Sequence, residues 1–295
     1  GNFTGKMSAN DRFGLDIAKI GDLDKDGIPD IAVGANADYD GGINSGAVWM
    51  LFLNRDGTVK SHQKISASQG GLVGLTASRQ FGFGITSLGD LDGDGITDIA
   101  VGSPTYDNDG GLYRGCVWIL FLNSNGTVKA QQKINDFQGG FTGELDNQDR
   151  FGATVINMGD INGDGIVDIA VHSMMDDDGA TDAGAIYLLF LKPDGTVKQT
   201  QKISATQGGF KGKINAGDSF GISIVNLGDI DGDGINDMFA GAPHLGINLV
   251  KDTSQIGGGY FIYLNNNGTV KDFVQISAEF PDWNNSIKKG TWFGE

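Results

Sequence analysis

The sequence contains a single cysteine, Cys116, in 295 residues. One cysteine excludes a framework of internal disulfides, and its place at the start of an apolar stretch indicates a small core residue rather than a reactive thiol. No apolar run approaches the roughly 20 residues that a membrane-spanning helix needs. No basic tract suggests binding to a membrane surface. We therefore expect neither membrane insertion nor a disulfide-stapled scaffold.

Basic residues are scarce, with 21 Lys and Arg against 37 Asp and Glu, which gives a net charge of −16. This balance argues against a nucleic-acid partner, because such proteins must neutralise phosphates. The three histidines, His62, His172 and His244, show no zinc-ligand spacing. No nucleophile elbow, phosphate loop or dinucleotide fingerprint is present. The sequence thus offers no signature of the common enzyme classes.

Helical periodicity is also missing, whereas glycine is abundant, at 49 residues. Glycine without a three-residue repeat is typical of many tight turns. The most prominent feature is an acidic nine-residue segment that occurs four times, at residues 22–30, 90–98, 160–168 and 229–237. Each copy has oxygen-bearing side chains at positions 1, 3, 5 and 9, Gly at position 6 and Ile at position 7.

Alternate side chains of such a tight loop can converge on one point, and carboxylates suit a hard cation. The glycine permits the positive φ of the sharp turn, and the Ile carbonyl can add a backbone ligand. A single acidic loop can be a solvated turn, but four in register favour a metal. The predicted ligands are Asp22, Asp24, Asp26, Ile28 and Asp30; Asp90, Asp92, Asp94, Ile96 and Asp98; Asp160, Asn162, Asp164, Ile166 and Asp168; and Asp229, Asp231, Asp233, Ile235 and Asp237.

Calcium fits these loops better than magnesium, which keeps its water ligands and seldom uses an all-protein cage. The helix-loop-helix calcium motif needs a bidentate Glu at position 12. Here that position is Val33, Val101, Val171 or Ala240, so each loop should lead into a β-strand. We expect about four Ca²⁺, one per repeat, and the 15 Asp of the loops account for much of the acidity.

The sequence repeats with a period of about 70 residues. Phe-Gly pairs begin at Phe13, Phe81, Phe151, Phe220 and Phe293. The first repeat predicts strands from Phe13 to the acidic loop, over 28–34, over 47–53 and over 58–65. Asp-Gly or Asn-Gly turns, such as Asp56-Gly57, separate the last two strands of each repeat and indicate hairpins. Four-stranded units at a fixed period predict an all-β fold, a β-propeller built of four-stranded blades with four repeats in this chain.

The Phe-Gly pairs, the acidic loops and Gly241-Ala242-Pro243 together resemble the FG-GAP repeats of integrin α-subunit propellers. The recurrent Asp-Gly-Thr-Val-Lys and Gln-Lys-Ile-Ser motifs are similar to those of bacterial secreted FG-GAP proteins. The resemblance covers nearly the whole chain as one domain, with repeats at about 1–68, 69–137, 138–206 and 207–279. Repeat three departs from it at Val171-His172-Ser173-Met174, where the loop after the second strand is expected to differ in shape.

The resemblance implies a calcium-binding, non-enzymatic module that acts outside the cell, secreted or at the cell surface, in adhesion or assembly. Two alternatives remain on the same scaffold. A lectin would present aromatics at one blade position, as Tyr39 and Tyr106 do in two repeats. A polysaccharide lyase would need a Tyr/His or Arg/Lys cluster. The expected partner is protein, through further blades or head-to-tail self-association that could produce filaments; carbohydrate is the alternative ligand.

Two further features of the sequence have more than one interpretation. Acidic clusters at residues 38–41, 107–110 and 176–179 follow the second strands, and a solvated turn explains them better than a second cation site. Residues 280–295 start a further repeat or form a terminal extension. We expect Trp292 and Phe293 to be buried against another blade.

Overall fold

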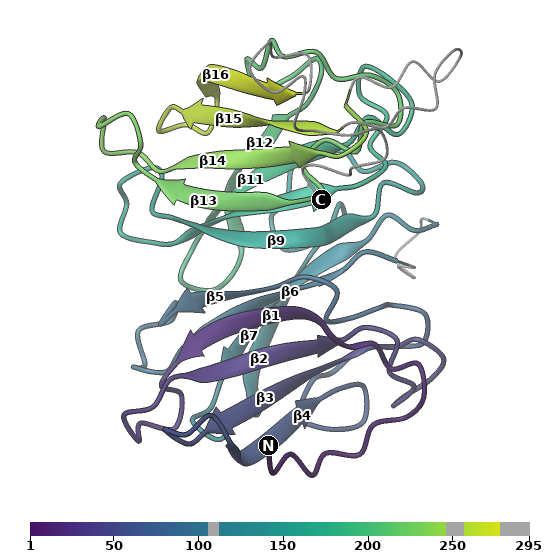
Figure 1. Ribbon diagram of the computed structural model, residues 1–295, viewed down its shortest axis with the longest axis vertical. Coiled ribbons are helices and arrows are strands. Elements are labelled where there is room, and N and C mark those ends of the chain that lie inside the picture. The colour runs from purple at the N-terminus through teal and green to yellow at the C-terminus, as the bar shows by residue number, and fades with distance from the viewer. Residues whose placement is uncertain (106–111, 246–256, 278–295) are drawn as a thin grey trace, which may run out of the picture.

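The computed structural model describes residues 1–105, 112–245 and 257–277. Their regular structure consists of sixteen β-strands in four antiparallel sheets and, within these ranges, includes no helix (Figure 1). Each sheet has four strands in sequence order. The predicted all-β architecture of four-stranded propeller blades is therefore confirmed.

Each repeat forms one blade. Blade 1 contains β1 (Phe13–Gly21), β2 (Asp30–Ala35), β3 (Ala47–Leu53) and β4 (Val59–Ile65); blade 2 contains β5 (Ile85–Gly89), β6 (Asp98–Ser103), β7 (Cys116–Leu122) and β8 (Val128–Ile134); blade 3 contains β9 (Phe151–Gly159), β10 (Asp168–Ser173), β11 (Ala185–Leu191) and β12 (Val197–Ile203); blade 4 contains β13 (Ile224–Gly228), β14 (Asp237–Ala242), β15 (Gly258–Leu264) and β16 (Val270–Ser277).

The third strand of each blade is the most apolar, and in the two inner blades it packs on both faces. In β7 every residue is buried, including Cys116 and Trp118. Trp49 and Cys116 are core residues, at 4% and 2% exposure, and for Cys116 the sequence predicted this. The hairpin turns also form as expected: the Gly57 amide donates to the Asn54 carbonyl at 2.9 Å, and Gly57 has a φ of 79°.

Three of the Phe-Gly pairs, those beginning at Phe81, Phe151 and Phe220, lie where one blade meets the next. Phe81 is fully buried and forms a parallel bridge to Gly46 of blade 1, where a Cβ on Gly46 would lie 2.1 Å from the Phe81 carbonyl oxygen. Phe81 and Phe220 themselves fall outside the regular ladders of β5 and β13, which begin four residues later than predicted. The Gly82 amide instead donates to the Gly102 carbonyl, an irregular start of the pairing.

The loop after the second strand of repeat three does not differ in shape, contrary to the sequence prediction. Asp176 donates its amide to Ser173, and Gly184 donates to the Asp176 carbonyl. Blade 1 makes the same two bonds through Asp38, from Asp38 to Ala35 and from Gly46 to Asp38. Blade 4, which keeps Gly241-Ala242-Pro243, makes the first of these bonds from the Leu245 amide to the Ala242 carbonyl. The backbone turn at the start of the loop is therefore the same with and without the Gly-x-Pro motif.

The hydrophobic core lies between blades. Separate clusters join blade 1 to blade 2, blade 2 to blade 3 and blade 3 to blade 4. The innermost strands pack in the same order, β1 on β5, β5 on β9 and β9 on β13. In the described chain, β1 and β13 show no packing of this extent, so the four blades form an open arc (Figure 1).

Candidate calcium sites

Each acidic loop connects the first strand of its blade to the second. The carboxylate at position 1 accepts a hydrogen bond from the amide of the glycine at position 6, at 2.8 Å from Gly27 to Asp22 and 2.7 Å from Gly165 to Asp160. The carboxylate at position 5 accepts from the Ile amide at position 7, as Asp94 does from Ile96 at 2.8 Å. These bonds hold the loop in the tight turn that the glycine permits.

The carboxylate at position 9 is the most deeply placed member of each loop. Asp98 is fully buried, and its two oxygens accept from the amides of Leu91 and Leu122, each at 3.0 Å. Burial raises the pKa of Asp98 to about 6. Asp30, Asp168 and Asp237 repeat this arrangement, and burial raises the pKa of each. Position 9 therefore fastens the loop to the end of the third strand, besides offering a ligand.

In three of the four loops the carboxylates converge. Ligand oxygens of three Asp side chains lie within 4.8 Å of one another in Asp22, Asp24 and Asp30, in Asp90, Asp92 and Asp94, and in Asp229, Asp231 and Asp237. Carboxylates at this spacing repel one another unless a cation lies between them, and an oxygen-only donor set suits Ca²⁺. The loop of blade 3, where Asn162 replaces an Asp, forms no such carboxylate triple.

A lysine on the fourth strand reaches every loop, which the sequence reasoning missed. Lys60 contacts Asp24 at 2.6 Å and also pairs with Asp26. The equivalent residues pair likewise: Lys129 with Asp92 and Asp94, Lys198 with Asp164, and Lys271 with Asp231 and Asp233. The bond from Lys60 lowers the pKa of Asp26. The signal was available, since a Thr-Val-Lys follows the hairpin glycine in all four repeats.

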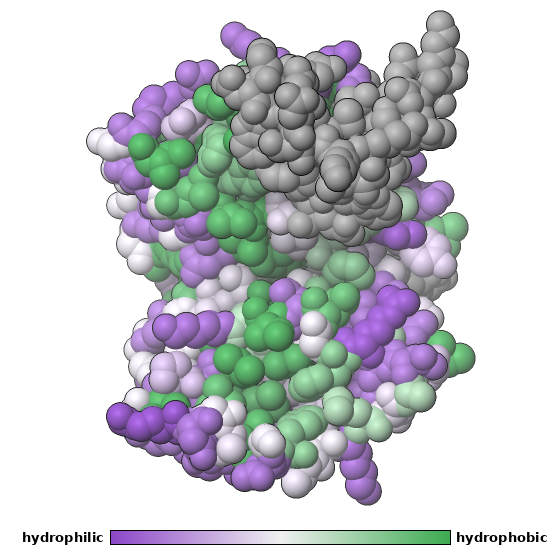
Figure 2. Space-filling view, in the orientation of Figure 1, coloured by the Kyte–Doolittle hydropathy of each residue, from purple (hydrophilic) through white to green (hydrophobic). Residues whose placement is uncertain are grey.

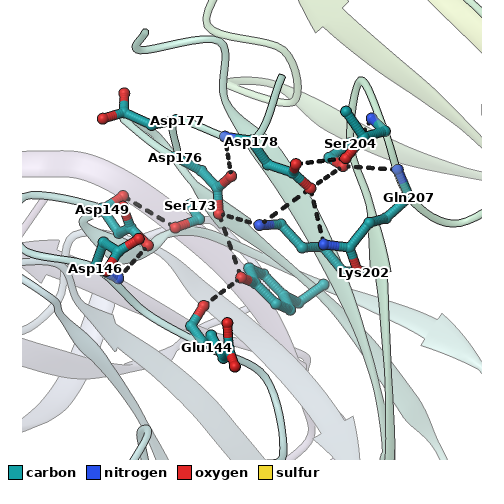
Figure 3. A network of polar contacts seen from close by, with 12 residues as sticks. Glu144, Asp146, Asp149, Ser173, Asp176, Asp177, Asp178, Lys202, Ser204 and Gln207 are labelled. Carbon is teal, nitrogen blue, oxygen red and sulfur yellow. Dashed lines mark hydrogen bonds and ion pairs between the residues drawn. The ribbon is translucent and has the colours of Figure 1, made fainter. Parts of the chain in front are cut away.

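A second acidic network lies beyond the second strand of blade 3 (Figure 3), and blade 1 has a counterpart. Asp176 is 2% exposed and pairs with Lys202 at 2.8 Å, and Asp38 pairs with Lys64 at 2.9 Å. Asp178 accepts hydrogen bonds from Ser204, Thr206 and Gln207. The expected solvated turn is thus wrong for these two clusters, because each buried carboxylate is paired with a lysine. The cluster at 107–110 lies outside the described residues, as does Tyr106.

This network lines a cavity of about 560 Å³ in blade 3. Tyr187 and Lys202 both face it, one residue from each of the two clusters that a lyase could use. The Tyr187 hydroxyl, however, donates to the Glu144 carbonyl at 2.8 Å, and burial raises the pKa of Tyr187 above its ordinary value. A phenol held in this way is a poor general base. Burial also raises the pKa of Asp149, in the same cavity, to about 7.

The comparisons with known proteins agree with this architecture. The FG-GAP repeat family model matches residues 81–120 and 152–189. The chain is built of FG-GAP repeats. It is 32% identical to mouse integrin alpha-2 over 221 residues, which is 74% of this chain and 16% of that protein. It is 30% identical to human integrin alpha-11 over 205 residues, 68% of this chain and 15% of that protein.

Other matches align over a shorter stretch or at lower sequence identity. Integrin alpha pat-2 of Caenorhabditis briggsae is 44% identical over 93 residues, 31% of this chain and 7% of that protein. The FG-GAP chain therefore spans less than a fifth of the length of these three integrin subunits. A solved structure of the rhamnogalacturonan lyase YesW superimposes with a TM-score of 0.43 and 16% identity, covering 94% of this chain and 50% of that one.

The remaining sequence predictions concern membrane insertion and exposed aromatic residues. In the described residues no helix has the length and apolar character needed to cross a membrane. Tyr39, 49% exposed, lies beside the Asp38 network, whereas Trp292 and Phe293 fall outside the described residues.

Proposed function

We propose that this chain is a calcium-stabilised, non-enzymatic FG-GAP propeller module that acts outside the cell in adhesion or assembly, with a protein as its partner. The observation that carries the calcium part is the convergence of three carboxylates within 4.8 Å in the loops of blades 1, 2 and 4. The similarity to integrin α-subunits supports the adhesive, extracellular part.

About four calcium ions would occupy the four loops, held by side chains at positions 1, 3, 5 and 9 and the Ile carbonyl at position 7. Bound calcium would neutralise the carboxylate repulsion within each loop. Because the loop joins the first two strands of its blade, calcium would stabilise the innermost hairpin of every blade. Millimolar calcium outside cells suits sites of moderate affinity, and a ligand that binds only the folded state raises stability by RT ln(1 + [L]/Kd).

Thermal melting in chelator, in calcium and in magnesium tests this proposal. At calcium 100-fold above Kd, each independent site adds about 2.7 kcal/mol to the free energy of unfolding. We expect calcium, more than magnesium, to raise the melting temperature and titration calorimetry to count about four sites. A melting temperature that is the same in chelator and in millimolar calcium contradicts the proposal.

A further inference from the structure

Every internal blade contributes two apolar faces to the fold. We call the side that packs on the following blade the forward face; in blade 1 it includes Ala32 and Met50. The side that packs on the preceding blade is the rear face; in blade 2 it includes Ile85 and Leu122. The chain contains three such forward-to-rear junctions, so the two faces are complementary by construction. The rear face of blade 1 and the forward face of blade 4 have no neighbouring blade in the described chain.

The rear face of blade 1 is apolar and only partly covered. Ile17 on β1 is 58% exposed, whereas its counterparts Ile85, Val155 and Ile224 are 4%, 1% and 3% exposed. Part of this face forms a separate buried cluster around Trp49, against which Phe3 and Phe13 pack, and the exposed part lies around Ile17. At its margin, Ile31 and Leu53 are only partly buried, although the equivalent residues of blades 2 and 3 are fully buried.

The forward face of blade 4 carries an unbroken apolar row across all four strands. Val225 pairs with Phe239, Phe239 with Phe261, and Phe261 with Val274. Val225 and Val274 are 47% and 46% exposed, and the two phenylalanines are partly exposed. The residues equivalent to Phe261 in blades 1, 2 and 3 are fully buried: Met50, Ile119 and Leu188.

Blade 4 differs from the earlier blades at three positions of this face, and the differences keep it apolar. Phe239 stands where the earlier blades have Ala, and its ring lies over Gly259, which stands where they have Val or Ile. A Cβ on Gly259 would lie 2.4 Å from that ring. A larger residue beside a smaller one keeps the packed volume, as interior packing requires. Val274 replaces the Gln at this position of the earlier blades and makes the row more apolar.

The two free faces point to the same side of the molecule. Figure 1 places blade 1 in front of blade 2 and blade 4 in front of blade 3, so the viewer looks onto both. Figure 2 shows apolar surface over blade 1 and over part of blade 4 in this view. Faces that point in opposite directions would build an open filament, whereas faces on one side can engage one partner together.

We propose that two copies of this chain pair through these faces, the forward face of blade 4 in each copy packing on the rear face of blade 1 in the other. The pair has two-fold symmetry and two identical junctions, each of the kind that the chain already contains three times. It closes rather than extending into the filament that the sequence suggested. This inference rests on the proposed function in one respect: it takes the proposed protein partner to be a second copy of this chain.

Sedimentation of the full chain in calcium, up to about 100 µM, tests the pair. The wild-type chain is expected at twice its mass of 31.0 kDa. Val225→Asp and Ile17→Asp each place a carboxylate in both junctions, and each should weaken pairing at least about 100-fold. Both side chains are about half exposed in the single chain, so folding should survive. Val73→Asp, at a residue 72% exposed elsewhere, is the matched control and should pair like wild type.

Mixing the two variants supplies a sharper test. A Val225→Asp copy and an Ile17→Asp copy can form one junction with both wild-type faces, so the mixture should pair more strongly than either variant alone. A wild-type chain that stays a monomer, or that forms open-ended species larger than two copies, overturns the closed pair. A monomer that still melts higher in calcium overturns only this inference, whereas a dimer indifferent to calcium overturns only the calcium proposal.

Discussion

Replacing Asp98 by Asn separates the two roles of position 9 in a calcium loop. The wild-type carboxylate is fully buried and accepts one backbone amide on each oxygen, from Leu91 and from Leu122. Asn keeps the size but turns one acceptor into a donor. One of the two amides then loses its partner and faces an NH₂ group.

A buried donor without a partner costs about 1–3 kcal/mol. We therefore expect Asp98→Asn to lower the free energy of unfolding by about 2 kcal/mol even without calcium. With an unfolding entropy of about 2.1 cal/mol/K per residue, a cooperative unit of 295 residues would melt about 3 °C lower.

Scanning calorimetry in chelator and in calcium measures both effects. Asp94→Asn is the matched control, because Asp94 belongs to the same loop but is exposed. In chelator, Asp94→Asn should lose much less stability than Asp98→Asn, because an Asn oxygen can still accept from Ile96 and the pair with Lys129 is exposed. In calcium, both variants should gain less stability than wild type. If Asp98→Asn melts like wild type in chelator, the backbone bonds do not carry the stability assigned to them here.

Three other substitutions test the remaining parts of the structure. Asn162→Asp should tighten calcium binding at one site, because it restores the missing negative charge of blade 3; unchanged calorimetric affinity would mean that position 3 contributes little. Burial lowers the pKa of His172 to about 3, so only the unfolded chain takes up this proton between pH 6.5 and pH 3. As the pH is lowered through that window, the free energy of unfolding should decrease, by about 2 kcal/mol at pH 5. The His172→Gly variant should lack this part of the pH dependence in denaturation experiments. Lys202→Met should cost about 3 kcal/mol by leaving Asp176 buried and unpaired, and a double variant with Asp176→Asn should recover part of that loss in urea unfolding.

Sequence reasoning went furthest where the chemistry is local. The nine-residue loops, the Asn-Gly and Asp-Gly turns and the strand of 47–53 were predicted because turn geometry and strand periodicity are written in consecutive residues. The period of about 70 residues predicted the number of blades. The convergence of carboxylates followed from their alternation within a single loop, and the structure places three of them together in blades 1, 2 and 4.

Contacts between distant segments could not be predicted in this way. Lys60 reaches Asp24 from 36 positions along the chain, because β4 lies across the sheet from the loop. Asp38 looked like a solvated turn residue until the fold placed Lys64 beside it.

The sequence by itself determined the blade and its acidic loop, because these depend on neighbours along the chain. Only the tertiary structure decided which apolar residues are covered, because burial depends on which blade lies alongside. Ile17 and Ile85 occupy the same position in their repeats, yet one is 58% exposed and the other 4%.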